Sequence, residues 1–143
     1  MDLFRALDVS ASGLTAQRSR MDVIAENLAN SETTATATGG PYRRRAVILE
    51  TLDGRTFPAM LRRDGMPDGG VQAARTVEMA DPPRRVFQPG HPQAGPDGFV
   101  NFPSVNPLTE MVDMLATTRA YEANASAFQA TKSMGAKLLE LLR

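Results

Sequence analysis

Apolar residues recur every seven positions over the first thirty residues of the chain. One column of this repeat holds Phe4, Ala11, Arg18 and Ala25, and a second column, three positions later, holds Leu7, Leu14, Met21 and Leu28. Two such columns are typical of a helix whose apolar seam packs against a partner helix. The pattern predicts one helix from about residue 2 to residue 28, in which Arg18 interrupts the seam.

The last segment shows the same spacing after a helix start signal. Asn106 can cap the first turn with its side chain. Pro107 suits the first helical position, because a backbone N–H there would have no acceptor within the helix and proline lacks that N–H. The repeat positions are Met111, Met114, Thr118, Tyr121, Ala125, Phe128, Lys132, Gly135, Leu139 and Leu142. We expect a helix over about 107–142, which would be about 54 Å long at 1.5 Å per residue.

The middle of the chain follows neither pattern. Residues 31–105 contain nine of the ten prolines and nine of the eleven glycines. The stretches RRRAVILETL and RTVEMA read as short strands, GRTFPAMLRR is a weaker candidate, and turn clusters such as DGMPDGG separate them. The expected fold class is α+β, with an N-terminal helical region over 1–30, a loop-rich β insert and connector over 31–105, and a C-terminal helical region over 106–143. The two terminal helices are expected to form a coiled-coil-like axial domain.

The length of the second helix argues against a compact globule. A compact chain of this size has a radius of gyration of about 14–15 Å, so a helix of about 54 Å would extend beyond it. This helix also carries apolar or small residues outside its repeat, namely Leu115, Ala116, Ala120, Ala123, Ala127, Ala130, Leu138 and Leu141. A helix that is apolar on several faces is a buried helix. We therefore expect other subunits to cover it.

Two asparagines close the first helix, in the stretch IAENLANSET. Asn27 and Asn30 both lie near the helix end, where backbone carbonyls lack partners. Asparagine tolerates the left-handed conformation that often ends a helix, so one interpretation is a simple helix stop. The other is that their amides bond to the main chain of a neighbouring element and fix a junction. The sequence alone leaves both open.

Charge and cysteine content narrow the class of protein. The chain has 16 basic and 16 acidic residues, so no net charge attracts it to nucleic acid or to an anionic membrane. It has no cysteine, which excludes disulfides, thiol catalysis and thiolate metal sites. The N-terminal stretch lacks the apolar core of a cleaved secretory signal, and no apolar run approaches the ~18 residues of a membrane span.

The residues that could carry chemistry are few. His91 is the single histidine, and only Asp97 lies near it in sequence as a second metal ligand. The arginine clusters at 43–45, 62–63 and 84–85 would suit nucleic acid if they shared one face, but solvated charge and subunit contacts explain them better. Asp81, Glu110 and Asp113 offer carboxylates that nothing gathers into a pocket. No nucleotide-binding, zinc-protease or serine-hydrolase motif is present. We expect no catalytic, cofactor-binding or metal-binding residues, and no enzyme.

Both termini carry motifs of one known family. The N-terminal stretch ASGLTAQRSRMDVIAENLANSETT resembles the signature of bacterial flagellar axial proteins, the family of the rod and hook. The matching residues are Ser12, Gly13, Leu14, Ala16, Gln17, Arg20, Asp22, Val23, Ile24, Ala25, Asn27, Ala29, Asn30 and Thr33. In the C-terminal stretch EMVDMLATTRAYEANASAFQATKSM, the family motif falls on Glu110, Met111, Arg119, Tyr121, Glu122, Asn124 and Met134. The connector FQPGHPQAGPDGFVNFPSVNP and the short length are closest to the proximal-rod members.

The resemblance implies a structural subunit of the flagellar basal-body rod that assembles helically through its terminal helices and transmits torque. Its partners would be other copies of itself, other rod proteins, the adaptor between inner-membrane ring and export gate at the rod base, and the flagellar type III export apparatus, which needs no cleaved signal. The stretch with Asn27 and Asn30 would mark where the axial helix ends, and TTATATGG would lead the chain outward to the β insert. The expected subunit-packing residues are Phe4, Leu7, Leu14, Met21, Leu28, Asn27, Asn30, Met111, Met114, Tyr121, Phe128, Leu139 and Leu142.

Two alternatives remain open from the sequence. The chain could be another short rod subunit of the same family, although its connector argues against this. From a different class, it could be a coiled-coil adaptor or a nucleic-acid-binding module that uses its arginines. Salt-dependent binding of nucleic acid would favour the latter.

Overall fold

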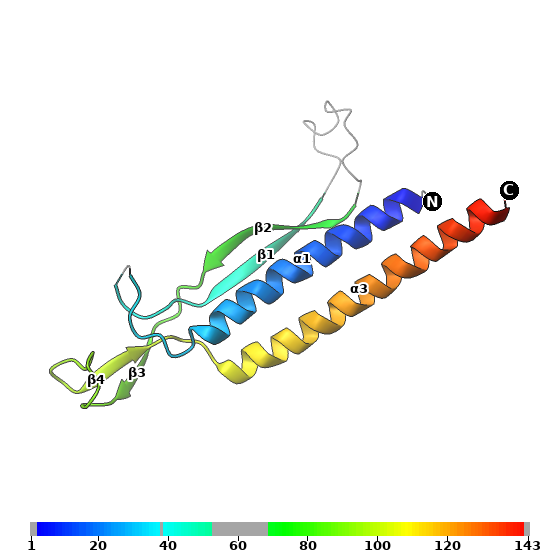
Figure 1. Ribbon diagram of the computed structural model, residues 1–143. Helices are drawn as coiled ribbons and strands as arrows, with labels where there is room; N and C mark the ends of the chain where they lie inside the picture. Colours follow the sequence, from blue (N-terminus) through cyan, green and yellow to red (C-terminus); the bar gives the residue numbers. More distant parts are fainter. Residues whose placement is uncertain (1–2, 38, 53–68, 142–143) are drawn as a thin grey trace, which may run out of the picture.

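Two long antiparallel helices form the body of the molecule. The computed structural model describes residues 3–37, 39–52 and 69–141. Helix α1 spans Leu3–Ala29 and helix α3 spans Pro107–Leu141, close to the expected bounds. The helices lie side by side, so both chain ends lie at the same end of an elongated molecule (Figure 1). The start signal acts as expected, because the side chain of Asn106 accepts a hydrogen bond of 3.0 Å from the backbone N–H of Leu108.

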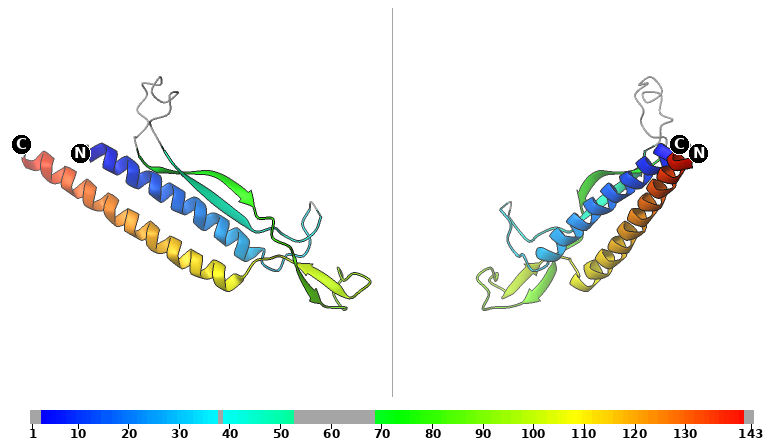
Figure 2. Two further views of the ribbon diagram at one scale, coloured as in Figure 1. Left: turned by 180° about the vertical axis from the view of Figure 1, so that it is seen from behind. Right: turned by 45° about the vertical axis from the view of Figure 1, so that its right-hand side comes forward.

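A two-stranded hairpin covers the face of α1 that is turned away from α3. Strand β1, Arg45–Thr51, pairs antiparallel with β2, Val71–Glu78, and a bulge interrupts the register between Ile48 and Leu49. The hairpin runs along α1, which therefore lies between the hairpin and α3 (Figure 2). The two stronger strand candidates are thus found, whereas the weaker one, GRTFPAMLRR, lies outside the described residues.

A second hairpin was not expected from the sequence. Strand β3, Arg84–Phe87, pairs antiparallel with β4, Phe99–Phe102, and this hairpin projects past the helix ends, away from the chain termini (Figures 1 and 2). We had interpreted this segment as a connector of turns. The interpretation was wrong because strands of four residues, separated by a turn rich in proline and glycine, carry too little alternation to be recognised.

The chain reverses direction immediately after α1. The N–H of Tyr42 bonds to the carbonyl of Thr33 at 3.0 Å, and the N–H of Thr36 bonds to the carbonyl of Gly40 at 2.9 Å. Gly39 and Gly40 have φ angles of 87° and 81°, a region that side chains with a Cβ avoid. TTATATGG therefore belongs to a hydrogen-bonded reversal that brings β1 back along α1. The expectation that it leads the chain outward from an axial core to the β insert stays a prediction.

Small residues allow α1 and α3 to approach closely. A Cβ placed on Gly135 would lie 2.6 Å from Leu3 Cδ2, and one placed on Gly13 would lie 3.0 Å from the side-chain nitrogen of Asn124. Among the described residues, the buried apolar side chains are few: Ala16, Ile24, Tyr42, Val100 and Val105. The apolar core of the single chain is therefore thin, and much of the surface of α3 stays uncovered.

Candidate assembly site

The end of α1, the start of β1 and the first turn of α3 meet at the side chain of Asn27. Its Oδ1 accepts hydrogen bonds from the Tyr42 hydroxyl at 3.0 Å and from the Arg45 N–H at 2.9 Å. Its Nδ2 donates to the Arg45 carbonyl at 2.8 Å and to Glu110 Oε2 at 3.1 Å. The amide is fully used, and the residue is 1 % exposed. Of the two interpretations of Asn27, the structure shows the junction.

Two arginines of the 43–45 cluster complete this junction. Arg44 Nε lies 2.7 Å from Glu110 Oε1, and its guanidinium also reaches Asp113 at 3.8 Å. Arg45 pairs with Glu26 at 2.6 Å and with Glu78 at 3.4 Å. Glu110 is itself only 1 % exposed, so its ion pair with Arg44 and its bond from Asn27 compensate a buried charge. We had assigned these arginines to solvated charge and subunit contacts. For Arg44 and Arg45 that was wrong, because both pair within the chain.

The phenol of Tyr42 is held in its neutral form. Burial raises the pKa of Tyr42 above its ordinary value of 10.0, and the Glu26 carboxylate adds to the shift, whereas the Arg45 guanidinium opposes it. The hydroxyl therefore remains a donor to Asn27 Oδ1 at neutral pH. Tyr42 and Glu110 were not recognised as partners of Asn27, because their approach depends on the chain reversal and on how the helices pair.

Asn30 is a helix stop. Its Nδ2 donates to the carbonyl of Glu26 at 2.9 Å, and its Oδ1 accepts from the hydroxyl of Thr33 at 3.1 Å. No residue other than glycine has a positive φ in the described part of the chain, so Asn30 does not adopt the left-handed conformation. The side chain instead donates a second hydrogen bond to the Glu26 carbonyl, which also accepts the backbone N–H of Asn30 at 3.0 Å.

The two heptad columns of α1 face different surroundings. The column of Leu7, Leu14, Met21 and Leu28 is half-buried. The hydroxyl of Thr118 on α3 lies 3.8 Å from the sulfur of Met21, which places this column toward α3. The other column consists of Phe4, Ala11, Arg18 and Ala25, and all four are exposed, with Phe4 at 74 %. Within one chain, therefore, only the second column contributes to a helix–helix seam.

The predicted packing residues of α3 also fall into two groups. Met114, Tyr121 and Phe128 are half-buried, on the same helical face as buried Thr117 and Gly135. Met111 and Leu139 are exposed, Leu139 at 72 %. Leu142 lies outside the described residues.

An apolar stripe follows the face of α3 that is turned away from α1. At the start of the helix it comprises Leu108, Val112 and Leu115, which are 57–70 % exposed and spaced four and three residues apart. Toward the other end, Met134 and Leu138 are exposed. Between these two groups the stripe continues through the exposed residues Ala116, Ala123, Ala127 and Ala130. Runs of uncovered apolar residues on a soluble domain mark interaction surfaces. We call this set the outer α3 stripe.

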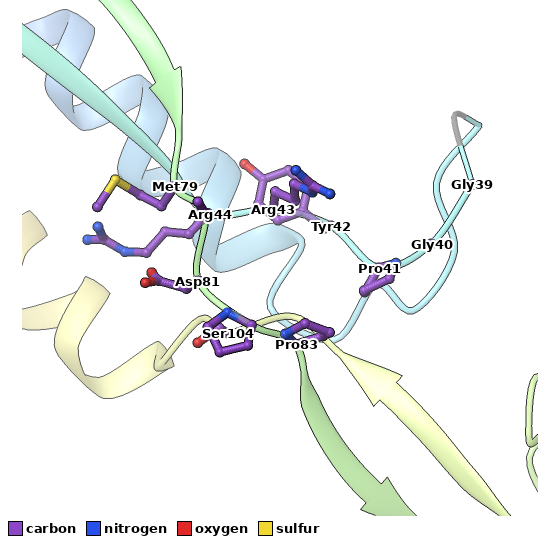
Figure 3. A pocket seen from close by; sticks show the side chains of 12 residues that line it. Gly39, Gly40, Pro41, Tyr42, Arg43, Arg44, Met79, Asp81, Pro83 and Ser104 are labelled. Atoms are coloured by element: carbon purple, nitrogen blue, oxygen red, sulfur yellow. The ribbon is translucent and has the colours of Figure 1, made fainter.

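One cleft of about 280 Å³ lies between the 39–44 segment and residues 79–83, beside Ser104 (Figure 3). Asp81 is its single carboxylate, and its lining contains neither histidine nor cysteine. Among the described residues there is no cluster of three potential metal ligands, and no helix is long and apolar enough to cross a membrane.

His91 lies in the turn between β3 and β4. Its Nδ1 accepts a bond of 3.2 Å from the N–H of Gln93, and its ring lies 6.3 Å from that of Phe102. On the same hairpin, Arg84 and Arg85 lie over the rings of Phe102 and Phe99, at 5.7 and 5.0 Å. His91 is therefore a histidine of a turn, and Arg84 and Arg85 pack on aromatic rings.

Comparison with known proteins identifies relatives along the whole chain. A family model described as "Flagella basal body rod protein" matches residues 7–35, and one described as "Flagellar basal body rod FlgEFG protein C-terminal" matches residues 97–141. The flagellar basal-body rod protein FlgC of Bacillus subtilis (strain 168) is 44 % identical over 99 % of both chains. The FlgC protein of Borreliella burgdorferi is 37 % identical over 100 % of this chain and 99 % of the relative. That of Escherichia coli O157:H7 is 36 % identical over 99 % and 98 %.

Proposed function

The chain belongs to the FlgC family of flagellar basal-body rod proteins and is a structural subunit of the proximal rod, and we propose that it assembles helically through its terminal helices to transmit torque. The outer α3 stripe carries this proposal. Leu108, Val112 and Leu115 are too exposed and too regularly spaced to serve the fold of one chain.

The exposed column of α1 fits the same role. Phe4, Ala11 and Ala25 offer small and apolar contacts along the helix, and neither α3 nor the β1–β2 hairpin covers them. In a head-to-tail assembly, a stripe on one copy meets a different stripe on the next copy, which generates an open helical filament. The exposed column of α1 and the outer α3 stripe supply two such surfaces. Packed in this way, the helices of neighbouring subunits would form the coiled-coil-like axial domain expected from the heptads.

The set of subunit-packing residues divides accordingly. We propose that Phe4, Met111, Leu139 and Leu142 contact other subunits, and that Leu7, Leu14, Met21, Leu28, Met114, Tyr121 and Phe128 hold the helix pair that presents these contacts. Asn27 and Asn30 shape the end of that pair. Close-packed interiors deform little, which suits a structure that carries torque.

The partners proposed are further copies of this chain, other rod and basal-body proteins, and the adaptor at the base of the rod. Export is proposed through the flagellar type III apparatus without a cleaved signal, and we propose no catalysis, no cofactor, no nucleic acid and no insertion into the membrane. The alternative of a nucleic-acid-binding module loses its main support, because Arg44 and Arg45 are engaged in ion pairs with Glu110, Glu26 and Glu78.

Copurification with basal bodies tests the proposal. In cells that lack the native gene, the wild-type chain should restore swimming and appear in isolated basal bodies. Leu115→Glu should abolish both and leave the stability of the purified chain within about 0.5 kcal/mol, because the site is exposed. Gln72→Glu, an exposed change on β2, is the matched control and should behave as wild type. Absence of the wild-type chain from basal bodies would contradict the proposal.

A further inference from the structure

We propose that the bond between Asn27 and Glu110 sets the register of α1 against α3, so that Glu110 is a positioning residue for the subunit. The inference concerns the helix pair itself, and only its consequence for assembly rests on the proposed function. Glu110 is suited to the task because it is buried, charged and bonded to two different elements, through Arg44 before β1 and through Asn27 on α1.

The structure fixes one antiparallel register. Four contacts between the helices join Leu3 to Gly135, Gly13 to Asn124, Met21 to Thr118, and Asn27 to Glu110. The residue numbers of these pairs add to 138, 137, 139 and 137, which means that the two helices keep one alignment from end to end.

The apolar pattern by itself does not select this alignment. The half-buried column of α1 repeats every seven residues, and so do Met114, Tyr121 and Phe128 on α3. Sliding α3 by seven residues, about 10 Å along its axis, would again place apolar residues of one helix against those of the other. Small side chains on α3, such as Ala125 and Thr131, would present few steric obstacles. A register error is therefore possible on apolar grounds alone.

The polar junction penalises both slipped alignments. In one direction, Asn27 would face Thr117 and Glu110 would extend past the end of α1. In the other, Glu110 would face Arg20, but Asn27 would extend past the start of α3. Each slip separates a buried amide from a buried carboxylate, and an unpartnered buried polar group is costly. A single polar residue in a helical seam is a known means of fixing register.

Register has a consequence outside the helix pair. Arg45, whose backbone is bonded to Asn27, begins β1, and α3 follows β4 within a few residues. A slip by one heptad would move the β3–β4 hairpin by about 10 Å relative to the β1–β2 hairpin. In a helical assembly every subunit would repeat the error, so the proposed rod requires one alignment.

The cysteine-free sequence allows a direct test by disulfide trapping. A disulfide requires Cα atoms within about 7 Å, so it reports which residues face each other. Gly13→Cys with Asn124→Cys reports the native register. Gly13→Cys with Thr117→Cys or with Thr131→Cys reports a slip by one heptad in either direction. The purified full-length chain is oxidised, and intrachain disulfides are quantified by gel mobility and by mass spectrometry of linked peptides.

In the wild-type background, the native pair should form and both slipped pairs should remain reduced. Asn27→Ala and Glu110→Ala should each raise trapping of a slipped pair at least about tenfold relative to the native pair. Glu110→Gln keeps an acceptor for the Asn27 amide and should retain the native register. Phe128→Ala is the control for general loosening, because it weakens the seam and leaves the junction intact; its ratio of slipped to native trapping should stay at the wild-type value.

Three results would overturn the inference: slipped pairs that stay reduced in Asn27→Ala and Glu110→Ala, an equal rise in Phe128→Ala, or no native trapping in the wild-type chain. None of these depends on whether the chain is found in basal bodies, so a failure of the proposed function would be recognised separately.

Discussion

The side-chain nitrogen of Asn27 lies 3.1 Å from Glu110 Oε2, although 83 positions separate the two residues in the chain. This contact joins the last turns of α1 to the first turn of α3, and both residues are inaccessible to water. The same asparagine holds the start of β1 through the N–H and the carbonyl of Arg45. One side chain thus joins three elements.

Asn27→Ala should destabilise the purified chain by about 2–3 kcal/mol. The substitution removes the partner of the Tyr42 hydroxyl and of the Arg45 backbone, and buried polar groups without partners each cost about 1–3 kcal/mol. Chemical denaturation followed by circular dichroism measures the change. Asn30→Ala is the matched control: its side chain makes only local, part-buried bonds at the helix end, so we expect a loss of about 1 kcal/mol. Equal losses in the two variants would contradict the special role of Asn27.

Tyr121→Ala and Phe128→Ala should block rod assembly while export of the chain continues. Both aromatics are half-buried, seven residues apart, so truncation should cost somewhat less than the about 3–5 kcal/mol of a fully buried ring, and the loss recurs in every subunit. Secretion and swimming assays distinguish export from assembly. Arg75→Ala, an exposed change on β2, should leave both intact. Normal swimming of the two aromatic variants would show that assembly does not depend on the seam that these aromatics form between α1 and α3.

Gly135→Phe should weaken the pairing of the helices near the chain termini. A Cβ at this position already approaches Leu3 Cδ2 to 2.6 Å, so a ring would force the helices apart at a cost of about 1–3 kcal/mol. Leu3→Ala in the same chain should restore part of the loss, because it removes the atom that the ring meets. A double-mutant cycle on denaturation free energies measures this coupling, and a coupling of zero would contradict the contact.

The stability of the chain should decrease at alkaline pH through Tyr42. Because burial raises the pKa of Tyr42 above 10.0, the folded state holds the phenolic proton more tightly than the unfolded chain does. The contribution of this group is therefore fully present below pH 10 and is lost as the pH rises through the folded pKa. Ultraviolet absorbance should resolve a late tyrosinate transition that Tyr42→Phe removes. If the late transition persists in Tyr42→Phe, its assignment is wrong.

The terminal helices follow from local information in the sequence. Two signals are sufficient to predict these helices: the heptad columns from Leu7 to Leu28 and from Met114 to Phe128, and the start at Asn106–Pro107. They are sufficient because residues spaced three and four apart lie on one face of a helix. The motifs at both ends likewise led to the correct family. The two strands β1 and β2 were also found from local information, because they carry enough β-branched and apolar residues to read as extended, whereas their pairing was not predicted.

Tertiary structure alone decided which faces are covered and which polar groups meet. The heptads place Phe4 and Leu7 in one seam, yet only the column of Leu7 turns toward α3, whereas the column of Phe4 stays exposed. The pattern likewise gives no sign that Arg44 pairs with Glu110 or that Tyr42 bonds to Asn27. Those contacts exist because the chain reverses after α1 and because α3 packs against α1 in one register. The reversal and the register bring together groups that lie far apart in the sequence, and distance along the sequence does not indicate distance in space.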